Sequence, residues 1–143
     1  MQLTQPSLAL TAEAASIAVG AAVKAAEALG VRINVAVVDA GGNLMAFLRC
    51  PGAFLHSIGI ATDKAYTAAS FGFPSGEWSA VLEGEQELRE GLLQVPRLVM
   101  IGGGLPIKVD GLVVGGIGVS GASEQQDLDC ARAGLAAIGL GEQ

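Results

Sequence analysis

Apolar residues near the N-terminus recur at helical spacing. Between Thr11 and Leu29 they return every three or four positions, and Gly30 follows the last of them. This period predicts an amphipathic helix that ends at the glycine. The predicted apolar face is rich in small side chains: Ala14, Ile17, Ala18, Ala21, Ala22, Ala25 and Leu29. Such a face permits close packing against a sheet.

Two apolar runs of strand length follow. Residues 33–38 are mostly β-branched, residues 44–48 are apolar, and the segment 40–43 between them has the composition of a turn. This pattern predicts a β-hairpin. Pro51 and Gly52 end its second strand.

Helical spacing returns in the middle of the chain. A helix is predicted from His56 to about Ser70, with Ile58, Ala61, Ala65 and Ala68 on one face. Residues 71–78 are turn-forming, and residues 79–90 form a predicted second helix, whose four glutamates indicate exposure to solvent.

Strand patterns dominate the next segment. We predict strands at residues 98–101, 107–109 and 112–119, with a glycine-rich loop at 102–106. The last two strands meet at Asp110-Gly111, a dipeptide typical of tight hairpin turns because both positions tolerate positive φ.

The last predicted helix begins at a capping box. Ser123 stands three residues before Gln126, and Leu128, Ala131, Leu135 and Ile138 follow at helical spacing. The element order is therefore α, ββ, αα, βββ, α. Strands linked by hairpins, with separate helices, predict an α+β domain over residues 1–143, in which helices flank an antiparallel sheet.

Composition narrows the function classes. The chain has 143 residues, of which 51% are hydrophobic and 15% charged, and its net charge is −6. So apolar a composition favours a homo-oligomer, while interruptions by Gly, Asp and Lys keep apolar runs below the roughly 20 residues of a membrane span. The acidic balance argues against nucleic acid. The N-terminus MQLTQPSLAL lacks the features of a secretory signal, so we expect a cytoplasmic location.

Four segments together carry a family resemblance. They are VVDAGGNLMAFLR (37–49), IATDKAYTAASFGFP (60–74), IGGGLPI (101–107) and VVGGIGVSGASEQQD (113–127). In order and spacing they resemble the GlcG/HbpS family, which is related to the C-terminal domain of PduO. The resemblance implies a profilin-like fold and higher oligomers. It also implies haem binding, or a link to corrinoid metabolism or small-molecule catabolism.

The chain departs from the family pattern at one place. Family members commonly have an acidic residue before a Gly-Ala pair, whereas Cys50-Pro51 precedes Gly52-Ala53 here. No role of that acidic residue can be carried over to this chain.

Glycines interrupt the strand predicted at residues 112–119. Gly115, Gly116 and Gly118 weaken an isolated strand, which indicates close approach of a ligand or of another backbone. Ser120 and Gly121 then form a predicted pocket rim. A dinucleotide site is excluded because no further strand follows to complete a βαβ unit. The segment also lacks the last glycine of a nucleophile elbow.

His56 is the only histidine. Its imidazole suits an axial haem ligand, a metal ligand or a general base, and the alternative is a hydrogen bond at the start of its helix. No zinc site is expected, because one histidine and two distant cysteines supply no tetrahedral ligand set.

Three basic residues are candidate anion contacts: Arg49, Lys64 and Lys108. Lys64 lies in an otherwise small and apolar helix, where Asp63 or a neighbouring strand is expected to position it. Surface solvation is the alternative for each. Thr67, on nearly the same face, could help line a pocket, but we expect it to bond back to its own helix.

Other candidates are weaker. Cys50 before Pro51 could give a thiolate to haem, but the interpretation we prefer is a strand that ends at the proline. Met45 and Met100 could be soft ligands, but we expect them in the core. Gly103 and Gly104 belong to a loop whose backbone N–H groups can face an anion, or they form a plain turn.

Acidic residues gather at the start of the last helix. Glu124, Asp127 and Asp129 suit the positive end of a helix dipole, which is the interpretation we prefer. Asp127 is also a minor candidate for a proton acceptor or an intersubunit contact.

These observations lead to one main functional hypothesis. We expect a small cytoplasmic homo-oligomer that holds haem or another small ligand between subunits. Its expected ligand-binding residues are Arg49, His56, Lys64, Gly103, Gly104, Ser120 and Gly121. The alternative is an isomerase or lyase of a catabolic pathway, in which His56 or Lys64 moves protons and Arg49 holds a small carboxylate. A third hypothesis is a purely structural oligomer, in which the glycines permit close packing.

Overall fold

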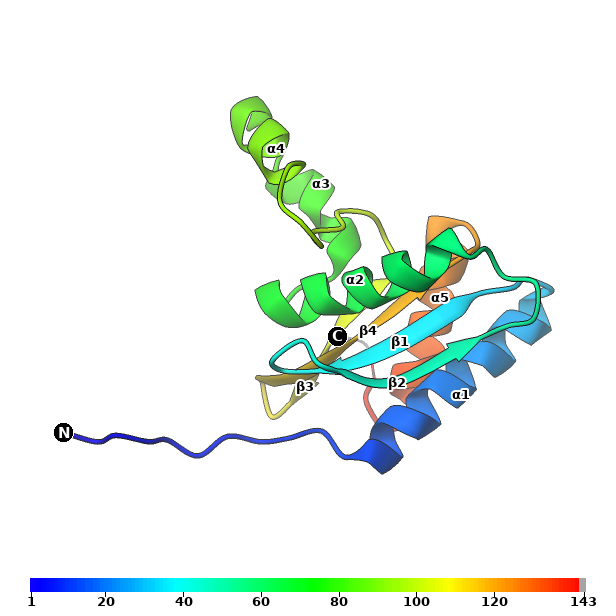
Figure 1. The fold of residues 1–143 in the computed structure, drawn as a ribbon, viewed down its shortest axis with the longest axis horizontal. Coiled ribbons are helices and arrows are strands. Elements are labelled where there is room, and N and C mark those ends of the chain that lie inside the picture. The colour runs from blue at the N-terminus through cyan, green and yellow to red at the C-terminus, as the bar shows by residue number, and fades with distance from the viewer. Residues whose placement is uncertain (142–143) are drawn as a thin grey trace.

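A computed structural model describes residues 1–141 and contains one antiparallel sheet with helices on both of its faces (Figure 1). In chain order the elements are α1 (Ala12–Leu29), β1 (Asn34–Asp39), β2 (Leu44–Arg49), α2 (His56–Phe71), the 3₁₀ turn η1 (Ser75–Glu77), α3 (Trp78–Val81), α4 (Gln86–Leu92), β3 (Gly104–Val109), β4 (Leu112–Ser120) and α5 (Glu124–Ala137). The strand order is β2-β1-β4-β3. Helix α2 covers one face, and α1 and α5 pack together on the other. The predicted α+β class is confirmed.

Helix α1 begins and ends where the sequence predicts. Thr11 caps its start by accepting from the Ala14 backbone N at 3.1 Å, and Gly30 ends it with a φ of 71°. The buried face of the helix is rotated by about one residue from the predicted face, as the exposure of Ile17 and Leu29 shows. The residues buried against the sheet and α5 are Ala15, Ala18, Val19, Ala22 and Ala26.

The hairpin at Asp110-Gly111 is confirmed, with φ values of 52° and 78° at its turn. Its first strand, β3, is longer than predicted and starts at Gly104. Pro106 is tolerated within it because β3 is an edge strand, where a missing N–H need not leave a gap in the ladder.

The strand predicted at residues 98–101 is wrong. That segment has no strand partner, and its backbone is bound by a side chain of α2 instead. The Val99 N–H donates to Thr67 Oγ1 at 3.0 Å, and Thr67 Oγ1 donates to the Arg97 carbonyl at 3.0 Å. The expected bond from Thr67 back to its own helix is therefore also wrong.

The helix predicted at residues 79–90 is divided in two. Helix α3 ends at Val81, Gly84 adopts a φ of 76°, and α4 starts at Gln86. Together they form an arm that extends away from the sheet (Figure 1). Trp78 anchors its base against Phe71 and Phe73, with ring centroids 4.8 and 4.9 Å away.

Glycines on the central strand β4 bring α2 unusually close to the sheet. A Cβ atom at Gly116 would overlap the Ala65 carbonyl oxygen, and one at Gly118 would overlap the Ala61 carbonyl oxygen. The backbone that approaches these glycines is therefore that of α2. Packing explains the glycine pattern at these two positions without a ligand.

Candidate functional site

Polar residues form a row across one end of the sheet. The strand register aligns Arg49 of β2 with Asn34 of β1, and Asn34 with Ser120 of β4. Residues paired in this way share a face of the sheet, here the face covered by α2. Asn34 and Ser120 are buried, whereas Arg49 reaches the surface.

Asn34 ties this end of the sheet to the loop that leads into α2. Its Nδ2 donates to the Phe54 carbonyl at 3.0 Å, and its buried Oδ1 has no hydrogen-bond partner within residues 1–141. The Arg49 guanidinium donates to the Ala53 carbonyl at 2.8 Å. Asn34 of β1 and Arg49 of β2 therefore both bind the loop that precedes His56.

His56 is the first residue of α2 and is exposed. Its neighbours Phe54 and Leu55 are 67% and 72% exposed. The exposed His56 imidazole therefore follows two exposed apolar side chains in the chain, and the Arg49 guanidinium of β2 is bound to the carbonyl of the residue before them. These are the groups that bind a flat apolar ligand bearing carboxylates.

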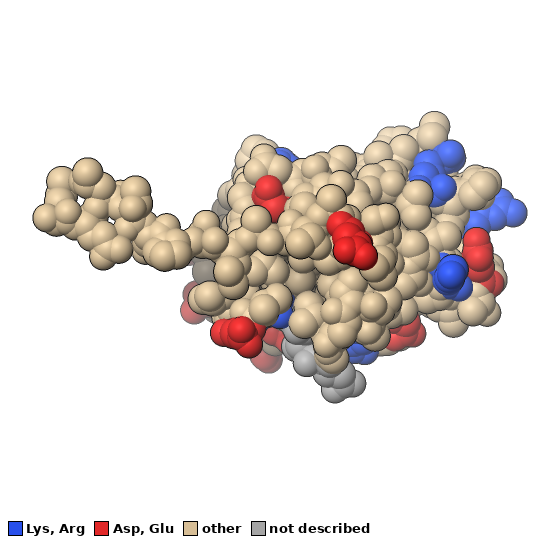
Figure 2. Space-filling view, turned by 90° about the horizontal axis from the view of Figure 1, so that it is seen from below, with Lys and Arg blue, Asp and Glu red and all other residues tan. Residues whose placement is uncertain are grey.

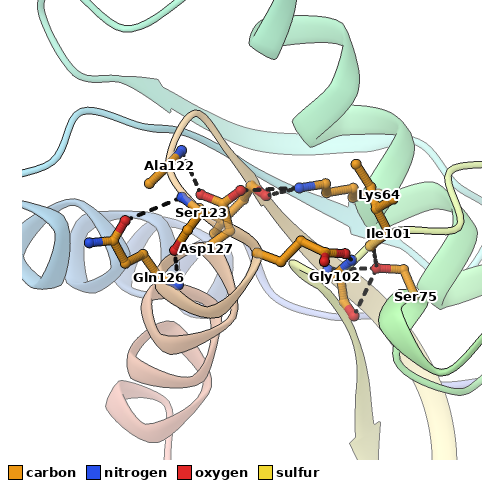
Figure 3. A network of polar contacts seen from close by, with 11 residues as sticks. Lys64, Ser75, Ile101, Gly102, Ala122, Ser123, Gln126 and Asp127 are labelled. Atoms are coloured by element: carbon orange, nitrogen blue, oxygen red, sulfur yellow. Dashed lines mark hydrogen bonds and ion pairs between the residues drawn. The ribbon is translucent and has the colours of Figure 1, made fainter.

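Lys64 belongs to a different environment. It lies eight residues after His56, about 12 Å along the helix axis, and only 1% of it is exposed. Its Nζ donates to the Val119 carbonyl at 2.9 Å and to Asp127 Oδ2 at 3.2 Å (Figure 3). The predicted partner Asp63 instead pairs with Arg97 at the surface, at 2.9 Å.

Asp127 does more than complement a helix dipole. Its Oδ1 accepts from the Ala122 backbone N at 3.0 Å while its Oδ2 meets Lys64. Burial raises the pKa of Asp127 and lowers the pKa of Lys64, and the attraction between the two charges opposes both shifts. The pair connects α2 to α5, which lie on opposite faces of the sheet.

At the end of the β3–β4 ladder, Lys64 supplies a hydrogen bond that no further residue of β3 provides. Val119 donates its N–H to the Gly103 carbonyl, and there the chain turns away with a φ of 124° at Gly103. Lys64 Nζ then supplies a donor to the Val119 carbonyl. A Cβ at Gly103 would lie 2.9 Å from Lys64 Nζ, so the glycine leaves room for the ammonium.

Side chains also replace backbone partners beside this point. Glu124 Oε1 accepts from the Gly102 N–H at 2.7 Å, and Ser75 Oγ accepts from the Gly104 N–H at 2.9 Å while donating to the Ile101 carbonyl at 2.6 Å (Figure 3). Gly103 and Gly104 are buried by these contacts.

The structure thus separates the predicted ligand-binding residues into two groups. Arg49, His56 and Ser120 gather around the start of α2, whereas Lys64, Gly103 and Gly104 form a closed internal network. Gly121 lies between the groups, in the turn from β4 to α5, with a φ of 134°. Their roles in binding stay predictions.

The remaining candidates are mostly buried. Cys50 and Cys130 are free thiols, and burial raises the pKa of Cys130 to about 11. Met45 packs against the core as predicted, and Lys108 is half-buried on β3. Within residues 1–141 no three His, Cys, Asp or Glu side chains are arranged to hold a metal ion. No helix of this part of the chain is both long and apolar enough to cross a membrane.

Sequence reasoning missed two residues at this end of the sheet. Asn34 was visible as a polar residue inside the apolar run 33–38, which is an available signal for a buried polar contact. Arg32 stands between the end of a helix and the start of a strand, where a charged residue is usually solvated, so the sequence offered no signal for it.

The fold and its packed glycines define a class of small α+β proteins in which an antiparallel sheet separates one helix from a pair. The sequence model of the family described as "Haem degrading protein HbpS-like" matches residues 10–136, and the chain belongs to this family. The resemblance predicted from the sequence is confirmed, including its relation to GlcG and PduO.

Two curated relatives and one solved structure illustrate the relationship. The corrinoid adenosyltransferase PduO of Salmonella typhimurium is 39% identical over 123 residues, which cover 85% of this chain but 36% of PduO. Protein GlcG of Escherichia coli K12 is 31% identical over 111 residues, which cover 78% of this chain and 81% of GlcG. The crystal structure of a PduOC:haem complex superposes with a TM-score of 0.85 at 37% identity, covering 94% of this chain and 98% of that one.

Proposed function

We propose that this protein binds haem, or a small ligand of similar chemistry, at the surface around the start of α2. The observation that carries the proposal is the exposed imidazole of His56 beside exposed Phe54 and Leu55. A haem group needs an axial ligand, apolar contact for the porphyrin and cations for its propionates. His56, the two apolar neighbours and Arg49 provide these groups. The family description and the haem complex of PduOC support the assignment.

The same surface favours an oligomeric site. Phe54 and Leu55 are too exposed to enclose a ligand within one chain. A second copy covering this surface would close the pocket and bury the apolar side chains.

Haem titration followed by absorbance spectroscopy tests the ligand. The unsubstituted protein is expected to give a Soret band with saturable, stoichiometric uptake. His56→Ala should shift the band or weaken uptake, because the chain has no other histidine. Cys50→Ala is the matched control and should leave the band unchanged, since that thiol is buried.

The outcomes separate the alternatives. A changed band in Cys50→Ala with none in His56→Ala would assign the axial position to the thiolate. No saturable uptake by the unsubstituted protein would remove haem from the proposal. Light scattering gives the mass in solution, and a monomer both with and without haem would contradict the intersubunit pocket.

A further inference from the structure

An open groove of 410 Å³ lies at the same end of the sheet, where three connections meet. Its walls come from the turn after α1, the loop between β2 and α2, and the start of α5. The residues that matter for its chemistry are Val31, Arg32, Ala53, Phe54 and Gln126. A volume of a few hundred Å³ suits a small organic molecule.

The backbone of this groove is shaped around Arg32. Gly52 and Gly121 both adopt positive φ, at 84° and 134°. A Cβ at Gly52 would lie 2.6 Å from Arg32 Nη1, and a Cβ at Gly121 would lie 2.7 Å from the Arg32 carbonyl oxygen. The two glycines therefore leave space beside the guanidinium and the main chain that carries it, and the Arg32 side chain is exposed to solvent.

Hydrogen-bond donors in the groove are unused. Within residues 1–141, arginine side chains form hydrogen bonds only at Arg49, Arg89 and Arg97, so Arg32 is left without a partner. Gln126 accepts from the Ser123 N–H through Oε1 in the capping box, and its Nε2 makes no hydrogen bond to any residue of the described part of the chain. Figure 3 shows that this amide nitrogen points away from Ser123, on the side of α1.

Charge also distinguishes the groove. No Asp or Glu lines it within the described chain, although the protein has 14 acidic and 8 basic residues. The larger groove beside the arm, by contrast, is lined by Glu77 and Glu83. At the end of the molecule opposite the extended N-terminal segment, several Lys and Arg side chains lie close together, with an acidic side chain among them (Figure 2).

We propose that this groove binds the carboxylate of a small organic acid. Arg32 pairs with the carboxylate through its guanidinium N–H groups, and Gln126 Nε2 gives a second hydrogen bond. Val31, Ala53 and Phe54 contact the apolar body of the ligand. The site shares Phe54 with the surface proposed for haem, but its polar groups, Arg32 and Gln126, are different from His56 and Arg49.

Titration with benzoate, followed by NMR of arginine Nε–Hε signals, tests the proposal. Benzamide is the uncharged probe of the same shape. The Arg32 signal is assigned by its loss in Arg32→Gln. Benzoate is expected to shift this signal with a Kd of about 1 mM, whereas benzamide should leave it in place. Arg32→Gln should weaken benzoate binding about tenfold or more. Arg132→Gln, which removes an exposed guanidinium from α5, is the matched control and should bind normally.

Gln126→Glu gives an independent test that preserves the fold. Glutamate retains the capping-box acceptor but places a negative charge in the groove, so benzoate binding should be lost while thermal unfolding stays unchanged. The proposal is overturned if benzoate leaves the Arg32 signal unmoved, if benzamide binds equally well, or if Gln126→Glu binds like the unsubstituted protein. Because Phe54 belongs to both proposed sites, benzoate is titrated into haem-free protein, and haem uptake is measured separately by its Soret band, so that failure of one proposal is distinguishable from failure of the other.

Discussion

Lys64 Nζ and Asp127 Oδ2 lie 3.2 Å apart at the end of the β3–β4 ladder, with 2% and 4% of their side chains exposed. The pair joins the helix on one face of the sheet to a helix on the other. Its two charges are separated from solvent, and the Val119 carbonyl and Ala122 N–H provide further hydrogen bonds to them. Removing either partner leaves the other charge buried alone.

Breaking this pair is expected to be strongly destabilising. Lys64→Met or Asp127→Leu should lower the free energy of unfolding by about 3–5 kcal/mol, because one buried charge loses its counter-ion. The double variant should lose much less than the sum, since neither charge remains. Urea unfolding measures all three. Asp63→Asn, which breaks the exposed pair with Arg97, is the control and should cost about 1 kcal/mol or less. Equal losses for Asp63→Asn and Asp127→Leu would contradict the buried pair.

The glycines of β4 give a second prediction. Gly118→Ala should destabilise the protein by about 3 kcal/mol or more, because its Cβ overlaps backbone atoms of α2 that no rotamer change can move. Gly59→Ala, in α2 itself, meets nothing within 4 Å and should stabilise the helix by up to about 1 kcal/mol. Thermal unfolding of the two variants compares these effects directly. A Gly118→Ala protein as stable as Gly59→Ala would refute the close packing of α2 on β4.

Thr67 should control the order of the segment around Val99. Thr67→Val removes both hydrogen bonds to that segment and leaves the Val99 N–H without a partner, at a cost of about 1–3 kcal/mol. Hydrogen exchange at the Val99 amide should accelerate in this variant. Thr62→Val is the control, because its hydroxyl bonds only to the Ile58 carbonyl of the same helix. Unchanged Val99 exchange in Thr67→Val would argue against the role of the hydroxyl.

Alkaline pH should destabilise the fold through Cys130. The unfolded thiol ionises near its ordinary pKa of 9.0, whereas burial holds the folded thiol protonated until about pH 11. The folded state therefore binds more protons between these values, so stability falls as pH rises through this window, by about 2–3 kcal/mol at most. Urea unfolding of Cys130→Ala lacks this contribution. The difference in the free energy of unfolding between the unsubstituted protein and Cys130→Ala should shrink from pH 9 to 11. A constant difference would show that the thiol pKa is unshifted.

Local rules predicted the elements whose signals lie within a few residues. The turn at Asp110-Gly111 needs positive φ, which those residue types tolerate, and the Ser123–Gln126 capping box satisfies its own backbone groups. The turn and the capping box could both be predicted because the contacts that stabilise them are made between residues close in sequence. The strand predicted at residues 98–101 failed because Thr67, more than 30 residues away, binds that backbone.

The family motifs were also readable from the sequence, since they lie in segments of fixed order, and they predicted the fold class. The site was only partly predictable. The motifs and residue types indicated Arg49, His56 and Ser120, and strand register then placed Arg49 and Ser120 in one row with Asn34. The pairing of Lys64 with Asp127 depended on where the β3–β4 ladder ends, a property of three elements distant in the chain.

The sequence by itself determined the three long helices, the two hairpins and the positions of the glycines, because spacing and backbone preference act locally. Only the tertiary structure decided which atoms approach those glycines. It showed that Gly116 and Gly118 admit the backbone of α2, while Gly52 and Gly121 admit Arg32. A missing Cβ creates space at a known residue, but folding alone determines what fills it.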